Sequence, residues 1–187
     1  MTLKAPLVAI AIACGLFVRG AASNYSTLPD FGDVSTFACL SGTFVTATGG
    51  PSIIVGDVGS SPGVMPPGQP ASTTIIGTNY GTNNITAAAQ TAALAVYAQL
   101  DALRVLATAI PAALAGVTLI PGVYSSATFT LASGTLVFDA LNDSNATFVL
   151  ISTGHLLISA PFAMFLVNGA LSSKIVWVIR DYASLAA

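Results

Sequence analysis

The chain has 187 residues, enough for one domain with its own core, and only 6% of them are charged, against roughly a quarter in an average soluble protein. Its mean hydropathy is +0.82, so a membrane protein has to be considered first. Beyond the leader region, however, every apolar run is cut by Gly, Ser, Thr, Asn or Pro, whereas a membrane-spanning helix needs about 20 consecutive apolar residues. The composition therefore argues against a bundle of membrane helices.

The N-terminal segment, from Met1 to Ala22, has the layout of a secretory signal peptide. Lys4 precedes an apolar stretch, residues 5–18, and Arg19 and the small residues 20–22 follow it. The alternative is an N-terminal membrane anchor, for which the stretch is short. We expect cleavage after Ala22 and one secreted domain, residues 23–187, with no membrane contact. That domain has three Lys and Arg against seven Asp, a formal net charge of −4, so nucleic acid is not an expected partner.

Two other features of the composition concern covalent chemistry. Cys14 lies in the leader and Cys39 remains alone, so no disulfide is available within the processed chain, and Cys39 is expected to be an apolar filler and not a nucleophile. Acceptor sequons for N-linked glycans occur at Asn24, Asn84, Asn142 and Asn145.

From about Thr36 onward the chain consists of short runs rich in Thr, Val, Ile and Phe, separated by Gly, Ser, Asn or Pro. Such runs predict β-strands. The Gly-rich segment 56–63 lacks both the Lys and the spacing of a phosphate-binding loop, so we interpret it as a corner of the fold. In chain order, the runs are residues 43–48, 52–55, 128–131, 135–138, 147–151, 155–158 and 174–178.

Residues 86–110 break this pattern and predict an amphipathic helix of about six turns. Asn84 or Thr86 can cap its start, Asp101 and Arg104 can pair across one turn, and Pro111 forces its end. The apolar side of the helix needs an apolar surface to lie on. Its side chains, at alternating spacings of four and three, are Ala89, Ala93, Val96, Leu100, Leu103, Ala107 and Ile110.

Three of the β-runs recur in order after the same number of residues. The same separation in sequence relates Phe129 to Leu156, Leu136 to Ala163, and Phe148 to Ile175. A constant offset over three successive runs predicts a three-faced β-solenoid in which each face stacks on its counterpart one turn later. Strand alternation then leaves an outward apolar strip, which is the natural seat for the helix and consists of Val149, Ile151, Val176 and Val178.

Enzymatic chemistry has little support in the residues. The chain has no Glu, and its Asp residues stand in turn-like contexts. Asp139 and Asp143 could form a carboxylate pair of the glycosidase type, but they share a turn with Asn142 and Asn145. His155 is the one His and has no second ligand nearby in sequence, so neither a metal nor a cofactor is expected.

The Thr and Ser residues are the remaining candidates for function. If Phe129 and Leu131 are buried, Thr128 and Thr130 point outward, and one turn later His155, Leu157 and Ser159 take the equivalent outward places. The same alternation turns Thr46 and Thr48 outward in the run 43–48. Thr also favours strands for structural reasons alone, so an ordinary solvent-facing β surface is the alternative interpretation.

An ordered series of motifs from about Val34 to Ala187 resembles the ice-binding protein family of microbes, fungi and algae. The resemblance implies a discontinuous right-handed β-helix with a long helix along one face, a secreted monomer without cofactor or metal, and adsorption to ice crystals. We take Thr128, Thr130, Ser159, Thr46 and Thr48 as the candidate ice-binding residues. The motifs are residues 56–63, 66–68, 119–124, 134–139, 145–150 and 175–177.

Two departures from the family pattern concern the end of the chain. The family continues through further coils after the Trp177 position, and residues 179–182 place charges and an aromatic where the family tends to have Gly and Ser. A truncation at the C-terminus, with an open coil edge at residues 177–187, is therefore expected.

Two other classes of function compete with ice adsorption. An extracellular adhesive or structural solenoid that binds polysaccharide or protein would need aromatic platforms, for which Tyr124, Tyr182 and Trp177 are the candidates. A lyase-like enzyme would need clustered charges, which the composition disfavours.

Overall fold

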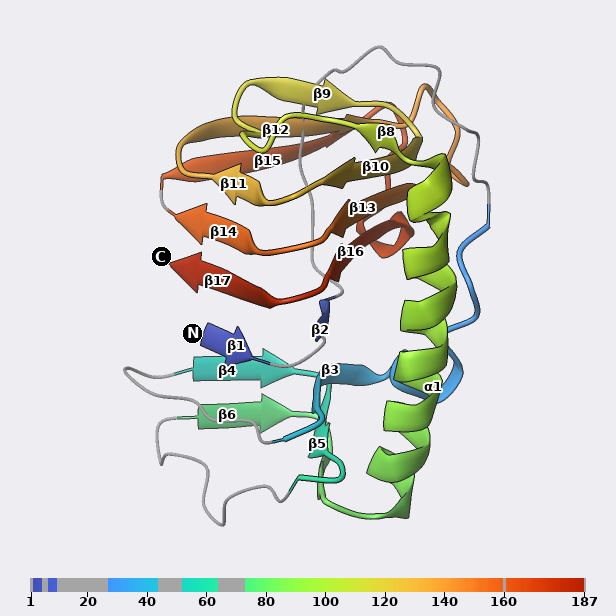
Figure 1. Cartoon of the computed structure of the whole chain (residues 1–187). Coiled ribbons are helices and arrows are strands. Elements are labelled where there is room, and N and C mark those ends of the chain that lie inside the picture. The colour runs from blue at the N-terminus through green and yellow to red at the C-terminus, as the bar shows by residue number, and fades with distance from the viewer. Residues whose placement is uncertain are drawn as a thin grey trace. The chain divides into compact units, whose positions relative to one another are not determined.

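The computed structural model describes residues 2–4, 7–9, 27–43, 52–63, 73–159 and 161–186 (Figure 1). The protein is mostly β with one long helix, as the sequence predicts. It divides into two compact units, Asp30–Ala98 and Gln99–Ala187, and the second also includes two short N-terminal strands. Within the described residues, no helix is long and apolar enough to cross a membrane.

The first unit contains two small parallel sheets and a short 3-10 turn, η1 (Gly32–Val34). One sheet joins β3 (Phe37–Ser41), β5 (Asp57–Ser60) and β7 (Asn79–Gly81), and the other joins β4 (Ser52–Val55) and β6 (Thr73–Ile76). The segment 56–63 is therefore not one corner, because its middle forms β5. Only its ends turn, at Gly56 with φ of +121° and in the bend at 61–63.

The helix α1 (Asn84–Ala102) begins one residue after its cap, Asn83. The Asn83 side-chain oxygen accepts hydrogen bonds from the backbone N–H groups of Ile85 and Thr86, at 2.9 and 3.1 Å. The Thr86 hydroxyl in turn accepts one from the N–H of Asn83 at 2.9 Å. This reciprocal pair satisfies N–H groups that have no partner inside the helix. Thr86 thus takes part in the cap as predicted, whereas the prediction of Asn84 is wrong by one position.

The helix ends at Ala102 and not near residue 110. The chain continues as a 3-10 turn, η2 (Leu103–Leu106), and then as β8 (Thr108–Ala109), which pairs in parallel with the later strand β10. Pairing in the sheet therefore overrides the helical pattern of the final part of the predicted helix. The four earlier members of the apolar stripe, Ala89, Ala93, Val96 and Leu100, are buried as predicted.

One glycine in the first unit permits close approach of the helix to its sheet. A Cβ on Gly59 would lie 2.3 Å from Cγ2 of Thr86, closer than carbon atoms can approach. We expect Gly59→Ala to lower the free energy of unfolding by about 1 to 3 kcal/mol through overpacking. Gly42→Ala is the matched control, since its Cβ would meet only the Gln90 side chain at an ordinary 3.6 Å. Urea unfolding of both variants checks this, and equal stability of the two would contradict the close approach.

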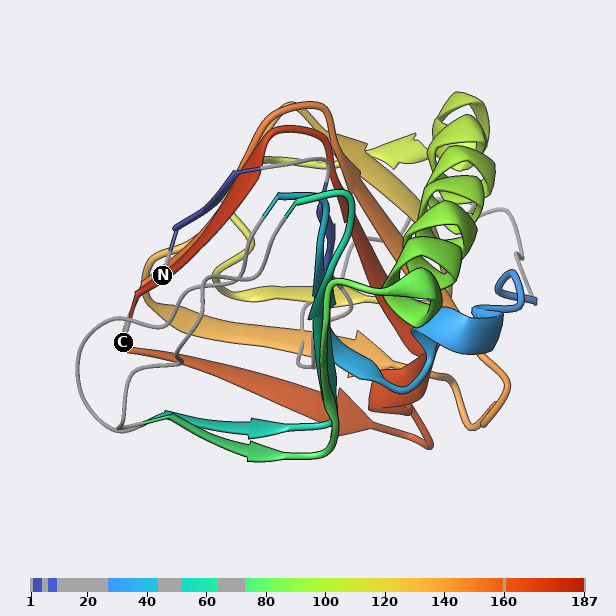
Figure 2. The ribbon, with the colours of Figure 1, turned by 90° about the horizontal axis from the view of Figure 1, so that it is seen from below.

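The second unit stacks successive turns of the chain in parallel within three sheets (Figure 2). The first sheet, called sheet A here, runs through β11 (Phe129–Leu131), β14 (Leu156–Ser159) and β17 (Tyr182–Ala186). Sheet B runs through β8, β10 (Gly122–Ser126), β13 (Phe148–Ser152) and β16 (Ile175–Ile179). Sheet C pairs β12 (Gly134–Asp139) with β15 (Phe162–Val167), and β9 (Val117–Leu119) lies against β12.

The register confirms two of the three predicted pairs. Phe129 lies opposite Leu156, and Phe148 opposite Ile175. The third is wrong by one residue, because Leu136 lies opposite Met164. The corner from Ile158 to Phe162 is one residue longer than the equivalent corner of the preceding coil, from Leu131 to Gly134. The next corner, from Val167 to Ile175, is one residue shorter than its equivalent, from Asp139 to Phe148, so the register is restored.

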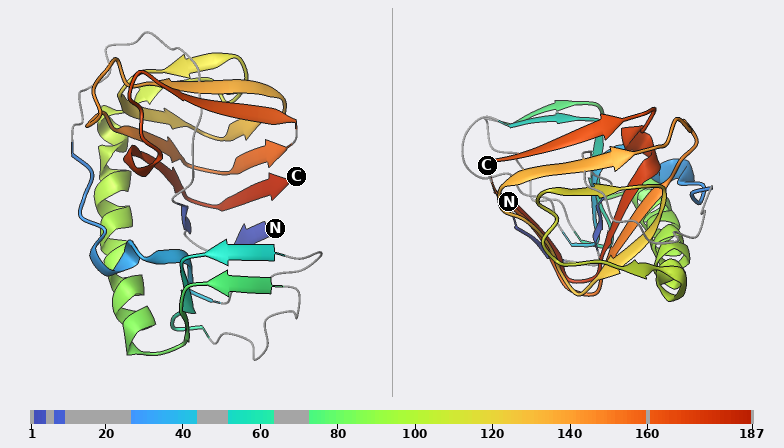
Figure 3. Two further views of the ribbon diagram at one scale, coloured as in Figure 1. Left: turned by 180° about the vertical axis from the view of Figure 1, so that it is seen from behind. Right: turned by 90° about the horizontal axis from the view of Figure 1, so that it is seen from above.

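The core of the second unit lies between its three sheets, as the view from above shows (Figure 3). Its aromatic members include Phe129, edge-on to Trp177 with ring centroids 5.6 Å apart, and Phe138, edge-on to Phe148 at 4.9 Å. The predicted strip on the other side of sheet B is covered as well, since Val149, Ile151, Val176 and Val178 are at most 1% exposed. The 3-10 turn η2 contacts β10 of this sheet.

Two N-terminal strands pair with the last coil. β1 (Thr2–Lys4) is antiparallel to β17, and β2 (Leu7–Ala9) is antiparallel to β16. The expectation of an open edge at 177–187 is therefore wrong for a chain that keeps these residues, because their backbone groups pair with that edge. Both strands lie within the predicted signal peptide, so an open edge stays a prediction for the processed chain.

Candidate functional site

The outer side of sheet A carries three of the five predicted residues. Thr128 immediately precedes β11, Thr130 lies within it, and Ser159 ends β14. Thr46 and Thr48 lie outside the described residues, so the structure does not test them. Sheet A is thus the surface on which the predicted site can be examined.

Parallel pairing aligns the outer side chains of sheet A in rows. Thr130 lies opposite Leu157, which lies opposite Ser184. By the same register, Thr128, His155 and Tyr182 form the neighbouring row. The face is therefore a mixed array with hydroxyl groups on all three strands, Ser159 being the one on β14, and not a continuous ladder of threonine.

The inner side chains hold this face in place. Phe129 is 0% exposed, and Leu131, Leu156 and Ile158 are buried with it, which confirms the predicted alternation along β11 and β14. The buried Ser152 hydroxyl lies 3.0 Å from the Ala127 carbonyl oxygen and 3.1 Å from that of His155, so it links the corners that lead into the adjacent strands β11 and β14. A buried, hydrogen-bonded scaffold of this kind keeps the outer rows rigid.

Thr130 is also tied to the preceding coil. Its backbone N–H donates to the Ala112 carbonyl at 2.8 Å, and its carbonyl accepts from the N–H of Leu114 at 3.0 Å. Its hydroxyl donates weakly to the same Ala112 oxygen at 3.4 Å. The half-buried Thr130 side chain therefore has a direction set by its contacts, and the lone pairs of its hydroxyl oxygen take no part in this bond.

Tyr182 and Ser184 also belong to this face. Tyr182 was predicted only as a possible aromatic platform, and Ser184 was not predicted. The sequence contains a pattern that predicts them, because they follow His155 and Leu157 by the same number of residues that separates equivalent positions of β11 and β14. His155 is a surface residue, as expected. Its Nδ1 lies 3.1 Å from a carboxylate oxygen of Asp181, and its ring stacks on Tyr182 with centroids 4.4 Å apart.

The other outer faces differ in chemistry. The outer side of sheet C includes the exposed Thr135 and Phe165, the latter 52% exposed. In the first unit, the sheet of β4 and β6 exposes Ile53 at 71% and Val55 at 70%, opposite Thr74 and Ile76. These faces carry more bulky apolar surface than sheet A.

The predicted carboxylate pair serves the turn in which it lies. A carboxylate oxygen of Asp139 accepts from the N–H of Leu141 at 2.9 Å and from the Asn168 amide at 2.8 Å. A carboxylate oxygen of Asp143 accepts from the N–H of Asn145 at 2.8 Å. These bonds stabilise residues with left-handed backbone, Leu141 and Asn142. The arrangement is that of a structural corner.

Asp101 pairs with a different partner from the one predicted. Its carboxylate accepts a hydrogen bond from Nε of Arg180 at 3.0 Å and a second from the same guanidinium, so the prediction of Arg104 is wrong. The hydrogen bond to Arg180 holds the pKa of Asp101 below its usual value. The pair ties the end of α1 to the residue that follows β16.

Three further candidates do not present reactive or binding groups. Burial raises the pKa of the half-buried Cys39 thiol, which disfavours the nucleophilic thiolate. Tyr124 and Trp177 are each 1% exposed, so neither is the predicted aromatic platform. Burial also raises the pKa of Tyr124 to about 12, and its hydroxyl donates to the Ile120 carbonyl at 2.6 Å.

Among the described residues, no group of three or more His, Cys, Asp or Glu could hold a metal ion.

Comparison with known proteins identifies the fold and the family. A family model described as ice-binding-like matches residues 39–187. A crystal structure of an ice-binding protein from an Antarctic biological consortium is similar with a TM-score of 0.73 and 30% identity, over 90% of this chain and 73% of that one. An ice-binding protein of the Antarctic ascomycete Antarctomyces psychrotrophicus gives a TM-score of 0.68 and 25% identity, over 86% and 78%.

A curated relative adds sequence evidence. An ice-binding protein of Nostoc sp. (strain HG1) is 36% identical over 118 residues, which are 63% of this chain and 43% of the relative, so the match spans less than half of the relative's length. The family is one of ice-binding proteins and not of enzymes, in agreement with the inventory of residues. Since the family model matches most of the chain, the protein belongs to the ice-binding-like family.

Proposed function

We propose that this protein is a secreted monomer that adsorbs to ice through the outer face of sheet A, carried by a right-handed, three-faced β-solenoid. One observation carries the choice of face. β11, β14 and β17 pair in register over a buried inner side, and their outer side presents one row of Thr130, Leu157 and Ser184 beside a second row in which the rings of His155 and Tyr182 are stacked. The groups proposed to meet ice are Thr128, Thr130 and Ser159, joined by Ser184. Thr46 and Thr48, which lie outside the described residues, stay the alternative site.

The spacing of such rows supports adsorption to a lattice. Strands stack about 4.8 Å apart, and alternate residues along a strand are about 7 Å apart. Methyl and hydroxyl groups at these intervals can hold ordered water that merges with the crystal. Because the face is already rigid, little conformational entropy is lost on binding, so many weak contacts can add up.

Sheet A is favoured over the other two sheets of its unit. The outer strip of sheet B is covered, so it cannot meet a crystal. The outer side of sheet C includes Phe165, whose ring is 52% exposed and would hold a flat lattice away from its neighbours, whereas the tyrosine of sheet A, Tyr182, is half-buried and stacked on His155. The strands β11, β14 and β17 themselves contain no Lys or Arg, whose long hydrated side chains would keep a lattice at a distance.

The proposal is tested by ice growth in the presence of the purified chain. We expect slower recrystallisation of a polycrystalline film and faceted single crystals, at concentrations where an unrelated protein of similar size has no effect. An adhesive module or an enzyme predicts neither result. A folded, monomeric sample that leaves both crystal shape and recrystallisation unchanged would contradict the proposed function.

A further inference from the structure

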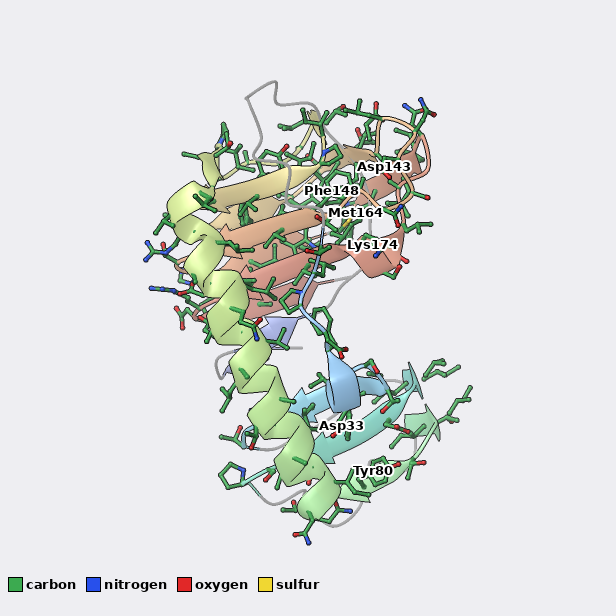
Figure 4. All side chains as sticks on the ribbon, turned by 90° about the vertical axis from the view of Figure 1, so that its right-hand side faces the viewer. Asp33, Tyr80, Asp143, Phe148, Met164 and Lys174 are labelled. Atoms are coloured by element: carbon green, nitrogen blue, oxygen red, sulfur yellow. The ribbon has the colours of Figure 1, made fainter. Side chains whose placement is uncertain are left out.

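The corner between β12 and β13 carries two adjacent glycosylation sequons on an exposed turn. Asn142 and Asn145 are both exposed, and Figure 4 labels Asp143 on the same turn. The turn is well fixed. Beyond the two Asp side chains described above, the N–H of Asn142 donates to the Asn168 carbonyl at 2.9 Å, and that of Ala146 donates to the Asp143 carbonyl at 3.1 Å. A fixed exposed turn can carry a bulky group without disturbing the core.

We propose that Asn145 is an acceptor of an N-linked glycan. In the transfer, the Asn145 amide nitrogen bonds to C1 of the first sugar of a lipid-linked oligosaccharide diphosphate. The bond from C1 to the diphosphate oxygen breaks, and the amide loses one proton as the lipid diphosphate leaves. The inference rests on the proposed secretion, because this donor and its transferase belong to the secretory route.

Asn145 is the better acceptor of the two. Its sequon has Ala146 in the middle, whereas the Asn142 sequon has Asp143 there. The donor is a diphosphate, so a carboxylate beside the acceptor repels it, and Ala146 does not.

Burial determines when the transfer takes place. Asn145 is exposed, but Ala146 is 5% exposed and Thr147 is 0% exposed, so the chain enters the core directly after the acceptor. The transferase must recognise the Thr147 side chain as well as Asn145. The glycan is therefore added to the chain before this coil closes, and the folded protein accommodates it because only Asn145 faces solvent.

The site lies away from the proposed ice-binding face. Each coil of the second unit has three corners, and the corner at 140–147 joins sheet C to sheet B, so it is the one corner that does not border sheet A. Figure 2 shows this orange loop on the opposite side of the unit from β14 and β17. A glycan there extends into solvent and leaves the outer rows of sheet A accessible.

Translation of the full chain with endoplasmic-reticulum microsomes tests the acceptor. We expect a protease-protected product that carries a sugar removable by N-glycosidase, and peptide mapping should place it on Asn145. Asn145→Gln should lose that sugar, whereas Asn142→Gln, the matched control, should keep it. Mapping by peptide also separates this position from the exposed sequon at Asn84.

The outcomes separate the two proposals. A protected chain with an unmodified Asn145 peptide overturns the acceptor alone and leaves ice adsorption untouched. A chain that is not translocated overturns secretion and the acceptor together. Glycosylated protein should slow ice recrystallisation as strongly as the same protein after N-glycosidase, and a loss of activity caused by the glycan would overturn its placement away from the ice-binding face.

Discussion

Phe129→Ala is expected to lower the free energy of unfolding by about 3 to 5 kcal/mol, the typical cost of removing a buried phenylalanine and leaving a cavity. The ring is fully buried in β11 and packs edge-on against Trp177, two coils away in the stack. Its loss removes an aromatic contact worth about 0.5 to 1.5 kcal/mol beyond burial, within that total. Urea unfolding followed by circular dichroism measures the change.

Phe165→Ala is the matched control for this substitution. The same atoms are removed from the same unit, but the Phe165 side chain is half exposed on sheet C. Its replacement should cost far less, because most of the ring is already in water. If both variants lose the same free energy of unfolding, Phe129 is not the core residue that the structure describes.

Thr130→Tyr is expected to abolish most of the ice activity while the protein stays folded. The hydroxyl-bearing side chain at this position lies in the outer row with Leu157 and Ser184, so a tyrosine there would stand above the plane and hold the lattice away. Thr128→Tyr should act in the same way in the neighbouring row. Substitutions of outward surface residues typically change the free energy of unfolding by no more than about 0.5 kcal/mol, so thermal melts should hardly move.

Thr135→Tyr separates a defect of the face from a general effect of the new side chain. Thr135 is exposed on the outer side of sheet C, and its replacement should leave recrystallisation inhibition unchanged. Full activity of both sheet A variants in folded protein would exclude this face. The run that includes Thr46 and Thr48 would then be the next candidate.

The sequence predicts most of the solenoid because one period governs it. The constant offset that relates Phe129 to Leu156 places their strands in one sheet, and the apolar alternation then decides which side is buried. The period does not predict the corners. A corner can gain a residue that the next corner loses, as happens around β15, and only the paired backbone reveals the shift.

The end of the helix and the partner of Asp101 were mispredicted for a related reason. Local spacing favours a helix to residue 110 and a pair with Arg104, but both are decided by contacts far along the chain. Thr108 pairs with Tyr124 in sheet B, and Asp101 meets Arg180. Propensity and short-range charge pairs contribute only a few tenths of a kcal/mol each, roughly, so long-range pairing overrides them.

The sequence predicts where the candidate face lies but not all of the residues that form it. Alternation along β11 identifies Thr128 and Thr130 as outward residues, and the constant offset extends the rows to His155 and Leu157. Extending the offset once more yields Tyr182 and Ser184. The charges at Arg180 and Asp181 interrupt the pattern of small and apolar residues, so the sequence alone does not favour a further strand of this face at Tyr182 and Ser184.

Incorporation into a growing ice crystal tests the central claim most directly. Fluorescently labelled protein is placed in a solution that freezes slowly around a cold probe, and the fractions in ice and liquid are compared. Adsorption through sheet A predicts that the chain and Thr135→Tyr become enriched in the ice, whereas Thr130→Tyr is excluded. Exclusion of the folded chain itself, or incorporation of Thr130→Tyr to the same extent as the chain, would contradict it.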